Sequence, residues 1–539
     1  MGIYRGPHEN FIKMFSYFNQ NNEVKDISVH YGQNWSDLNT DNAALNSIFE
    51  AVDDGDGVVQ AEELNKLNKI FAYIDNLVKK TKNNGVLEQN ELEKFQSNLK
   101  KGKIDIDNLP DSEPETTNWS EGLDRNITAI KLSGSSTAVF LPQLKEELRE
   151  IAAEQGFTVE EIESGNDPWV EDSSIRRADG KQYVQYYCDK NVSFDKVDKL
   201  SIDNRSVVGG QGRVYNQGNA FDLDIDNNNR YYGSSYLEGG NVLNTCLADG
   251  TPAAVVGESS IAYTLKVMGL ENTEENVEIA KQQIASDLGL KVENVTFIPQ
   301  YDFHIDMTYR PLHNGEFAVP DYEESIRLLK ETSIPSLDID YKDVKSRLYD
   351  LLDKVSDNAE DIMGRSYTVD SVKDILEDTP VTLRFMVSKV VDTYNEAPEK
   401  LEGLVSDETM QMFILFSQSS VRMKEGFSSD KEILIKELEE LCESSKSART
   451  LAEEALTAGG YKVVKIPAFT GTNNFMNGVA GTSAKTGDSF YITNKPTTPE
   501  LEGIITEYFQ QAGVDKVYFV STTDALRSKG GIDCLTQEE

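Results

Sequence analysis

Hydrophobic residues recur at helical spacing in several segments of the chain, and each of these segments closes with a glycine. One example carries Val277, Ala280, Ile284 and Leu288 on a single face and ends at Gly289. A run rich in β-branched and aromatic residues follows each glycine, as is typical of a strand. Four such units occupy residues 146–159, 277–298, 452–466 and 501–520. The repetition predicts an α/β fold built from similar helix-and-strand modules.

Over residues 321–455 the modular pattern is interrupted by consecutive helical stripes. Val344 and Leu348 share one face of an early stripe, and Leu434 and Leu438 share a face of a later one. We interpret these stripes as ordinary core packing. The segment is therefore predicted to be a helical insertion within the modular unit.

The first part of the chain has a different character, with helical spacing and many Asn, Asp and Lys residues. It leads into a polar stretch that contains Pro110 and Pro114, and proline cannot continue a helix. The sequence therefore predicts an all-α domain at 1–105, a linker at 106–125 and the modular unit at 126–539, which the insertion interrupts.

Within the first domain, a short acidic segment resembles the calcium loop of an EF-hand. Asp53, Asp54 and Asp56 precede the glycine of the bend, and Glu63 stands six places after that glycine. Calcium needs a close cage of oxygen ligands that includes a bidentate Glu at this spacing. A second loop at 83–91 keeps the glycine and the Glu but lacks the carboxylates. A calcium site in the first loop and a helical pair that keeps only the EF-hand shape both remain open.

The chain is strongly acidic, with 53 Lys and Arg residues against 92 Asp and Glu residues and a net charge of −39. This balance opposes binding to nucleic acids or anionic membranes, and it favours cationic partners such as calcium and arginine-containing peptides. No apolar run approaches the roughly 20 residues that span a bilayer, and no secretory signal is seen at the N-terminus. A cytoplasmic location is the expectation, with secretion left open.

Cysteine and histidine are both scarce, which narrows the candidates for nucleophilic chemistry. The four cysteines show no Cys-x-x-Cys spacing and indicate no disulfide framework. Of the four histidines, only His304 and His313 lie in the modular unit, so Cys-His chemistry there must use one of them. His313 lies in a polar turn, whereas a strand through His304 would place it on the same face as Asp306. By itself, this spacing is more often that of a structural His-Asp pair.

Four short motifs change that interpretation. They are Trp169 to Asp172, Glu238 to Asn241, Phe303 to Asp306, and Gly530 to Gln537. In this order they resemble the Trp-x-x-Asp, Glu-Gly-Gly, His-x-Asp and C-terminal Cys motifs of the guanidine-modifying (pentein) superfamily, which includes deiminases and amidinotransferases. The resemblance implies a five-module α/β propeller over the modular unit, with the insertion excepted. The chain departs from the family at Asp533, where the family commonly has His before the nucleophile.

The resemblance implies catalytic roles for five residues, namely Cys534, His304, Asp306, Asp172 and Glu238. The chemistry agrees with these residue types, because a guanidinium stays protonated at physiological pH and a catalyst must hold a planar cation. Asp172 and Asp306 would bind that cation, and Cys534 would attack its carbon as a thiolate. His304, held by Glu238, would move protons for the departing ammonia and the incoming water.

The resulting prediction is a deiminase that converts an arginine-type guanidinium to a ureido group and releases ammonia. Trp169 is expected to take part in substrate binding. A peptidylarginine deiminase-like enzyme is favoured, because the modules are joined to an EF-hand-like domain and a large insertion. An agmatine or free-arginine deiminase, an amidinotransferase and a non-catalytic calcium-binding protein remain alternatives. The chemistry requires no cofactor, although the first domain could add Ca²⁺, and the expected partner is an arginine-containing protein or a small guanidino compound.

Overall fold

The structure is a computed structural model that describes most of the chain between residues 12 and 539. Outside the description lie residues 1–11, 20, 22, 31–32, 54, 56, 60–62, 64–65, 68–69, 72, 75–85, 105, 107–118, 135–140, 163–167, 172–174, 186–198, 203–204, 209–229, 234, 356–379, 420 and 529. In the part of the chain that is described, no helix is both long and apolar enough to cross a membrane.

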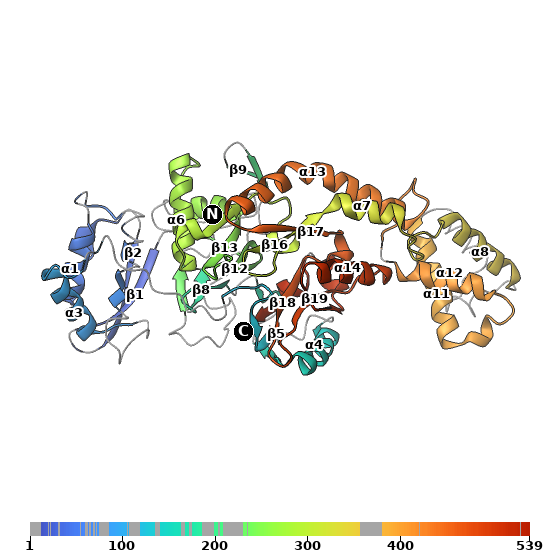
Figure 1. The fold of residues 1–539 in the computed structure, drawn as a ribbon, viewed down its shortest axis with the longest axis horizontal. Helices are drawn as coiled ribbons and strands as arrows, with labels where there is room; N and C mark the ends of the chain where they lie inside the picture. The colour runs from blue at the N-terminus through green and yellow to red at the C-terminus, as the bar shows by residue number, and fades with distance from the viewer. Residues whose placement is uncertain are drawn as a thin grey trace, which may run out of the picture.

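Five small sheets repeat one arrangement of strands (Figure 1). Their strands, in sheet order, are β21 (Thr536–Glu538), β5 (Ala129–Ser133) and β6 (Thr158–Ile162); β7 (Ile175–Arg176), β8 (Gln182–Gln185) and β11 (Arg230–Gly233); β12 (Val242–Cys246), β13 (Pro252–Gly257) and β14 (Val295–Ile298); β15 (Arg310–Pro311), β16 (Glu316–Asp321) and β17 (Lys462–Pro467); and β18 (Gly478–Ser483), β19 (Ser489–Asn494) and β20 (Lys516–Val520). In the last of these sheets β4 (Asn126–Ile127) adds a fourth strand, which is parallel to β18. Each central strand pairs antiparallel with the first neighbour and parallel with the second. The predicted α/β class is confirmed, whereas closure of these sheets into a propeller stays a prediction.

In four of the five sheets the described residues between the parallel partners include helices, because two parallel strands cannot be joined by a tight hairpin. Between β8 and β11 the described residues form the strands β9 (Lys199–Ile202) and β10 (Arg205–Val208). The connecting helices are α4 (Leu141–Gln155), α5 (Ser259–Met268), α6 (Glu274–Leu288) and α14 (Glu500–Gln511), and α15 (Thr523–Arg527) and α16 (Ile532–Leu535) follow β20. The predicted helix-then-glycine pattern is present in α6, which ends at Gly289 with φ 73°. Its N–H bonds back to the last turn in the left-handed conformation that glycine favours, so the chain can turn directly into the next strand.

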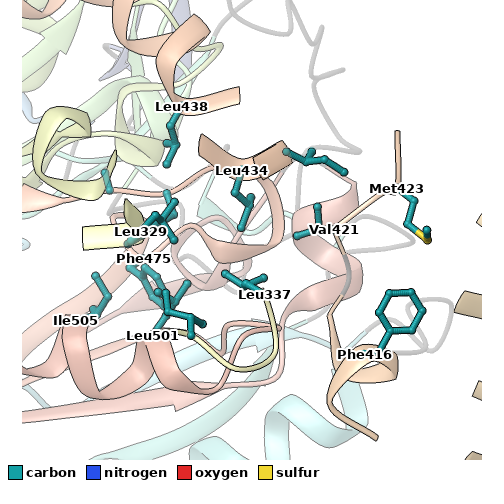
Figure 2. Packing of buried hydrophobic residues seen from close by; sticks show 14 of the residues in the cluster. Leu329, Leu337, Phe416, Val421, Met423, Leu434, Leu438, Phe475, Leu501 and Ile505 are labelled. Atoms are coloured by element: carbon teal, nitrogen blue, oxygen red, sulfur yellow. The ribbon is translucent and has the colours of Figure 1, made fainter. Parts of the chain in front are cut away.

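A helical segment, residues 322–458, lies between β16 and β17. Its described helices are α7 (Tyr322–Glu331), α8 (Tyr341–Lys354), α11 (Pro380–Glu396), α12 (Asp407–Gln418) and α13 (Asp430–Ala458). Figure 1 shows α8, α11 and α12 at one end of the molecule, away from the sheets. Figure 2 shows Leu434 and Leu438 of α13 near Leu329 of α7, and the same buried cluster includes Leu501 and Ile505 of α14. The helical segment therefore shares its core with the sheet modules.

The first 105 residues are not all-α, which corrects the prediction. They contain a sheet of β2 (Val24–His30), β1 (Ile12–Phe18) and β3 (Val86–Leu87), together with α1 (Ala43–Val52) and α3 (Gln89–Lys100). β1 and β2 are rich in β-branched and aromatic residues, which favour strands, and they pair antiparallel as a hairpin. β3 pairs with β1, so part of the second predicted loop, 83–91, forms a strand of this sheet.

The predicted calcium loop keeps part of its expected form. Asp53 Oδ1 accepts hydrogen bonds from the backbone N–H groups of the two glycines that follow it, at 2.9 and 3.3 Å. Glu63 is buried and accepts a hydrogen bond from Nε1 of Trp35 at 3.1 Å. Asp54 and Asp56 lie outside the described residues. Among the side chains that are described, no group of three or more His, Cys, Asp or Glu could hold a metal ion, and the calcium site stays a prediction.

Candidate active site

Cys534 lies in the single turn of α16, directly before β21, and its side chain is buried. Two glycines lead into this turn. A Cβ atom on Gly530 would lie 2.2 Å from the ring of Trp169, and a Cβ atom on Gly531 would lie 2.2 Å from Oδ1 of Asn477. The Gly-Gly pair of the motif is therefore required, because it lets both side chains approach the backbone before the nucleophile.

His304 and Asp306 belong to a turn and not to a strand, which corrects the sequence prediction. β14 ends at Ile298, and the 3-10 turn η7 (Ile305–Met307) begins directly after His304. The N–H of Thr308 donates to the carbonyl of Ile305 at 3.0 Å, which closes the turn. The two-residue period of a strand therefore does not apply to this motif.

The turn nevertheless brings the two side chains to one place, over a glycine of the Glu-Gly-Gly motif. A Cβ atom on Gly240, in the turn η5 (Gly239–Asn241), would lie 2.4 Å from Nδ1 of His304 and 3.1 Å from Oδ1 of Asp306. The motif needs glycine here because the imidazole and the carboxylate rest where a side chain would stand.

Glu238 fixes the imidazole of His304. Its Oε2 lies 2.9 Å from Nε2 of His304, and its Oε1 accepts a hydrogen bond from the hydroxyl of Tyr236 at 2.6 Å. All three side chains are buried. Since both carboxylate oxygens are engaged, Glu238 has one orientation and holds the ring in one plane.

Gln300 joins the His and Glu-Gly-Gly motifs through its side-chain amide. Nε2 donates to Oδ1 of Asn241 at 3.2 Å and to the carbonyl of Phe303 at 3.0 Å. Oε1 accepts from the N–H of Ser259 at 3.1 Å, so this amide also reaches the start of α5. The two motifs are thus tied together by a buried side chain.

Asp306 connects this group to the nucleophile. The Cys534 thiol donates to Oδ2 of Asp306 at 3.1 Å. Nδ2 of Asn477 donates to the same oxygen at 2.8 Å and to Sγ of Cys534 at 3.4 Å. Burial raises the pKa of the Asp306 carboxyl, while nearby His304 and the thiol oppose that rise. A thiol, a carboxylate and an imidazole therefore meet in one desolvated site.

Three asparagines that the sequence did not single out hold the site together, two of them at the turn of the nucleophile and one at η7. Oδ1 of Asn477 accepts from the N–H of Asp533 at 2.9 Å, and Oδ1 of Asn494 accepts from the N–H of Ile532 at 3.0 Å. Asn474 donates to the carbonyl of the last residue of η7 at 2.9 Å. Their signal in the sequence is weak, because asparagine next to a strand also marks an ordinary turn.

The remaining predicted site residues are placed only in part. Trp169 packs on Gly530 and beside the cluster that contains Cys534. Asp172, the second predicted guanidinium ligand, lies outside the described residues, and its role stays a prediction. His313 pairs instead with Asp124, with Nδ1 and Oδ1 2.8 Å apart at the surface. His304 is thus the histidine of the modular unit that lies in the motif cluster.

No protein-family model matches the chain, and no curated protein matches it. A structure provisionally assigned as a peptidyl-arginine deiminase has TM-score 0.36 at 12% identity and covers 78% of this chain and 98% of its own. The C. jejuni agmatine deiminase has TM-score 0.34 at 12% identity, covering 78% and 94%. DDAH from Pseudomonas aeruginosa, in complex with citrulline, has TM-score 0.31 at 9% identity, covering 77% and 100%.

Two of these three are deiminases by name.

Proposed function

We propose that the chain is a cysteine-dependent hydrolase of arginine-type guanidino groups. The observation that carries this proposal is the 3.1 Å contact between the Cys534 thiol and the Asp306 carboxylate, beside the pair of His304 and Glu238. A carboxylate can hold a planar cation, a thiol can attack its carbon, and an imidazole can move the protons that both half-reactions require.

In the first half-reaction, Asp306 would hold guanidinium nitrogens through charge-assisted hydrogen bonds, with Asp172 as the proposed second carboxylate. The thiolate of Cys534 would form a bond from sulfur to the guanidinium carbon. Protonated His304 would give its proton to one nitrogen, and the bond between that nitrogen and the carbon would break. Ammonia leaves, and the carbon stays bound to sulfur.

In the second half-reaction, water would add to the same carbon. His304, now neutral, would remove a proton from the water as its oxygen bonds to the carbon. The bond between carbon and sulfur would then break, and its electron pair would return to sulfur as the thiolate. The proton that remains on the added oxygen is released and taken up by ammonia. The products are therefore a ureido group and ammonium, and the net reaction consumes one water molecule.

Peptidyl-arginine is the proposed substrate, with agmatine and free arginine as alternatives. Met307 and Leu526 form a small buried cluster with Cys534, and Trp169 and Phe303 pack against it. Apolar walls suit the methylene stem that all three substrates share. The preference for a protein substrate comes from the size of the helical segment and of the N-terminal region, which a small-molecule enzyme does not need. We further propose that the five sheets close into a ring around this site.

The test is incubation of the purified chain with benzoyl-arginine ester, agmatine and free arginine, with and without calcium. Ammonia and ureido product are measured separately, and an added amine acceptor would reveal amidino transfer. We expect equal amounts of ammonia and ureido product, and a loss of about 10⁴-fold or more in Cys534→Ala. Cys442→Ala, a partly buried cysteine on α13, is the matched control and should keep full activity. Undiminished turnover in Cys534→Ala would reject the mechanism.

A further inference from the structure

Arg310 and Asp533 form a buried ion pair next to the nucleophile. The Arg310 side chain is 1% exposed and Asp533 is 4% exposed. Nη2 of Arg310 donates to Oδ2 of Asp533, and Nη1 of Arg310 lies 3.6 Å from Oε2 of Glu121. Neither side chain is one of the groups that the proposed mechanism uses. Burying two charges away from water is costly in free energy, so we expect the pair to have a role in the site.

The pair connects two of the catalytic motifs. Arg310 lies in β15, four positions after Asp306, and Asp533 immediately precedes Cys534. The N–H of Asp533 donates to Asn477, whose amide in turn donates to Asp306 and to the thiol. A closed circuit of contacts therefore runs from the guanidinium of Arg310 through the nucleophile turn to the carboxylate of Asp306, and back along the backbone to Arg310.

Several other charges face this circuit. The carboxylates are Glu121, Glu171, Asp306 and Glu538, and the cations besides Arg310 are Arg125, Arg176 and, when protonated, His304 beside Glu238. Burial raises the pKa of Asp533 well above its usual value, and Arg310 opposes that rise most strongly. Burial also raises the pKa of Glu171 well above its usual value, and the neighbouring carboxylates add to the rise. The nucleophile turn thus lies in an environment with an excess of acidic groups.

A carboxylate at Asp533 without a counter-charge would oppose the formation of a thiolate on the next residue. We propose that Arg310 is a positioning residue that neutralises Asp533 and holds the Cys534 turn against Asp306, so that this chain can carry an acid directly before its nucleophile. The proposal rests on the proposed function and deepens it, because it explains how the departure at Asp533 is compatible with a reactive thiol.

The experiment measures the ionisation of Cys534 directly, by its rate of alkylation with iodoacetamide between pH 5 and pH 10. Mass spectrometry of the peptide that contains Cys534 separates this thiol from the other cysteines. In Arg310→Met we expect the midpoint of the pH profile to rise by about one unit, so that alkylation near pH 7 slows about tenfold. In Arg310→Lys, which keeps the charge, the midpoint should stay within about 0.3 units of the wild type.

A second set of variants tests whether the ion pair itself is responsible. Asp533→Asn should lower the midpoint or leave it unchanged, because it removes the carboxylate beside the thiol. The double variant Arg310→Met with Asp533→Asn leaves no uncompensated charge from the pair, and it should return the midpoint most of the way to the wild-type value. The double variant and Asp533→Asn keep the proposal testable even if Arg310→Met does not fold.

Arg449→Met is the matched control. Arg449 is also a buried arginine, 6% exposed, but it pairs with Glu323 in the helical segment. Its loss should lower thermal stability and leave the Cys534 profile unchanged. The proposal is overturned if Arg310→Met leaves the midpoint unchanged, if Asp533→Asn raises it, or if the double variant is no closer to the wild type than Arg310→Met.

This readout needs no substrate, so it separates the two proposals. If the wild-type protein turns over no guanidino compound but shows the expected midpoints, the proposed function fails and the role of Arg310 stands. If turnover is found but the midpoints do not move, the positioning role fails and the function stands. With both correct, Arg310→Met should lower kcat by about tenfold near pH 7 while KM changes by less than about threefold.

Discussion

Two buried regions of this molecule are held together by different means. The site around Cys534 is a network of directional contacts, in which Asp306, Asn477 and the Glu238–His304 pair each have defined hydrogen-bond partners. The core of the helical segment is apolar, and side chains such as Leu348 and Phe413 are fully buried among other hydrophobic residues. Both regions exclude water. The hydrogen bonds of the first require a particular donor or acceptor at each position, whereas the packing of the second depends mainly on side-chain volume.

The difference shows how each region should respond to change. In the polar site, exchanging one atom alters the chemistry although the shape is kept, because a buried donor or acceptor then loses its partner. In the apolar core, a similar change in volume costs stability in proportion to the cavity that remains. Substitutions in the polar site should therefore lower activity more than stability, and substitutions in the apolar core should lower stability more than activity.

Among the variants that compare these two regions, the largest effect is expected for Asp306→Asn. It keeps the shape of the side chain but replaces the carboxylate by an amide. The carboxylate accepts a hydrogen bond from the Cys534 thiol, and its charge would bind the substrate cation. We expect kcat/KM to fall by about 10²- to 10³-fold, the loss typical of charge-assisted contacts. Steady-state assays of ammonia release on the most active substrate give this value.

The same variant should be at least as stable as the wild type in weakly alkaline solution. Burial raises the folded-state pKa of Asp306, so the stability that this group contributes is present at low pH and is lost as pH rises through the folded pKa. Asparagine does not ionise and avoids that loss. A lower melting temperature than the wild type at pH 8 would contradict this account of the site.

Gly240→Ala should be the next most damaging to activity. A methyl group there would lie 2.4 Å from Nδ1 of His304, and the imidazole is held on its other side by Glu238 and cannot shift freely. We expect kcat to fall by about 10²-fold through displacement of the ring. Gly503→Ala in α14 is the matched control, because nothing lies within 4 Å of its added Cβ, and it should stabilise the helix by about 0.5–1 kcal/mol with full activity. Equal activities of the two variants would contradict the packing described for Gly240.

Leu348→Ala tests the apolar region. The side chain is fully buried in the shared core, and its truncation should lower the free energy of unfolding by about 2–5 kcal/mol. Chemical denaturation followed by circular dichroism measures this loss. At a temperature where the variant is folded, kcat/KM should stay within about twofold of the wild type, and a larger fall would show that the helical segment supports the catalytic site.

The smallest effect is expected at Glu121 and depends on pH. Burial raises its pKa from 4.5 to about 7, although Arg310 and Arg125 oppose the rise. Its contribution to stability is therefore fully present below about pH 4.5 and is lost as pH rises through about 7. Glu121→Gln should reduce the difference in melting temperature between pH 5 and pH 8 by a few degrees, measured by differential scanning calorimetry. An unchanged difference would show that Glu121 does not titrate in this range.

The sequence predicted those features that rest on local signals. Residue types alone indicate the glycine that ends α6 and the β-branched residues of β14. They also indicate the Gly-Gly pair before Cys534. The proximity of His304 and Asp306 was expected for the wrong reason, since they share a 3-10 turn and not a strand. Gly240 leaves room for both side chains, and this contact between η5 and η7 is a tertiary feature that no local period reveals.

Other features required the folded chain. The ion pair of Arg310 and Asp533 joins residues 223 positions apart, and neither residue has a local signal that names the other. The hairpin of β1 and β2 was missed because the helical spacing of the following residues dominated the interpretation of the first 105. The ion pair depends on a partner that is distant in sequence, whereas the strands of the hairpin carry a local signal in their β-branched and aromatic residues.

The pairing of β16 with β17 has a consequence for how the chain folds. Glu316 and Lys462 are opposite each other in register although 146 positions separate them, and closing so long a loop costs more conformational entropy than closing a hairpin. α7 and α13, which adjoin these strands, are bridged by Arg449 to Glu323 and by Lys330 to Glu439. Once these two helices associate, the ends of the strands are already near each other. We therefore expect the helical segment to form early and to speed the assembly of this sheet, because contacts within helices are local and fast.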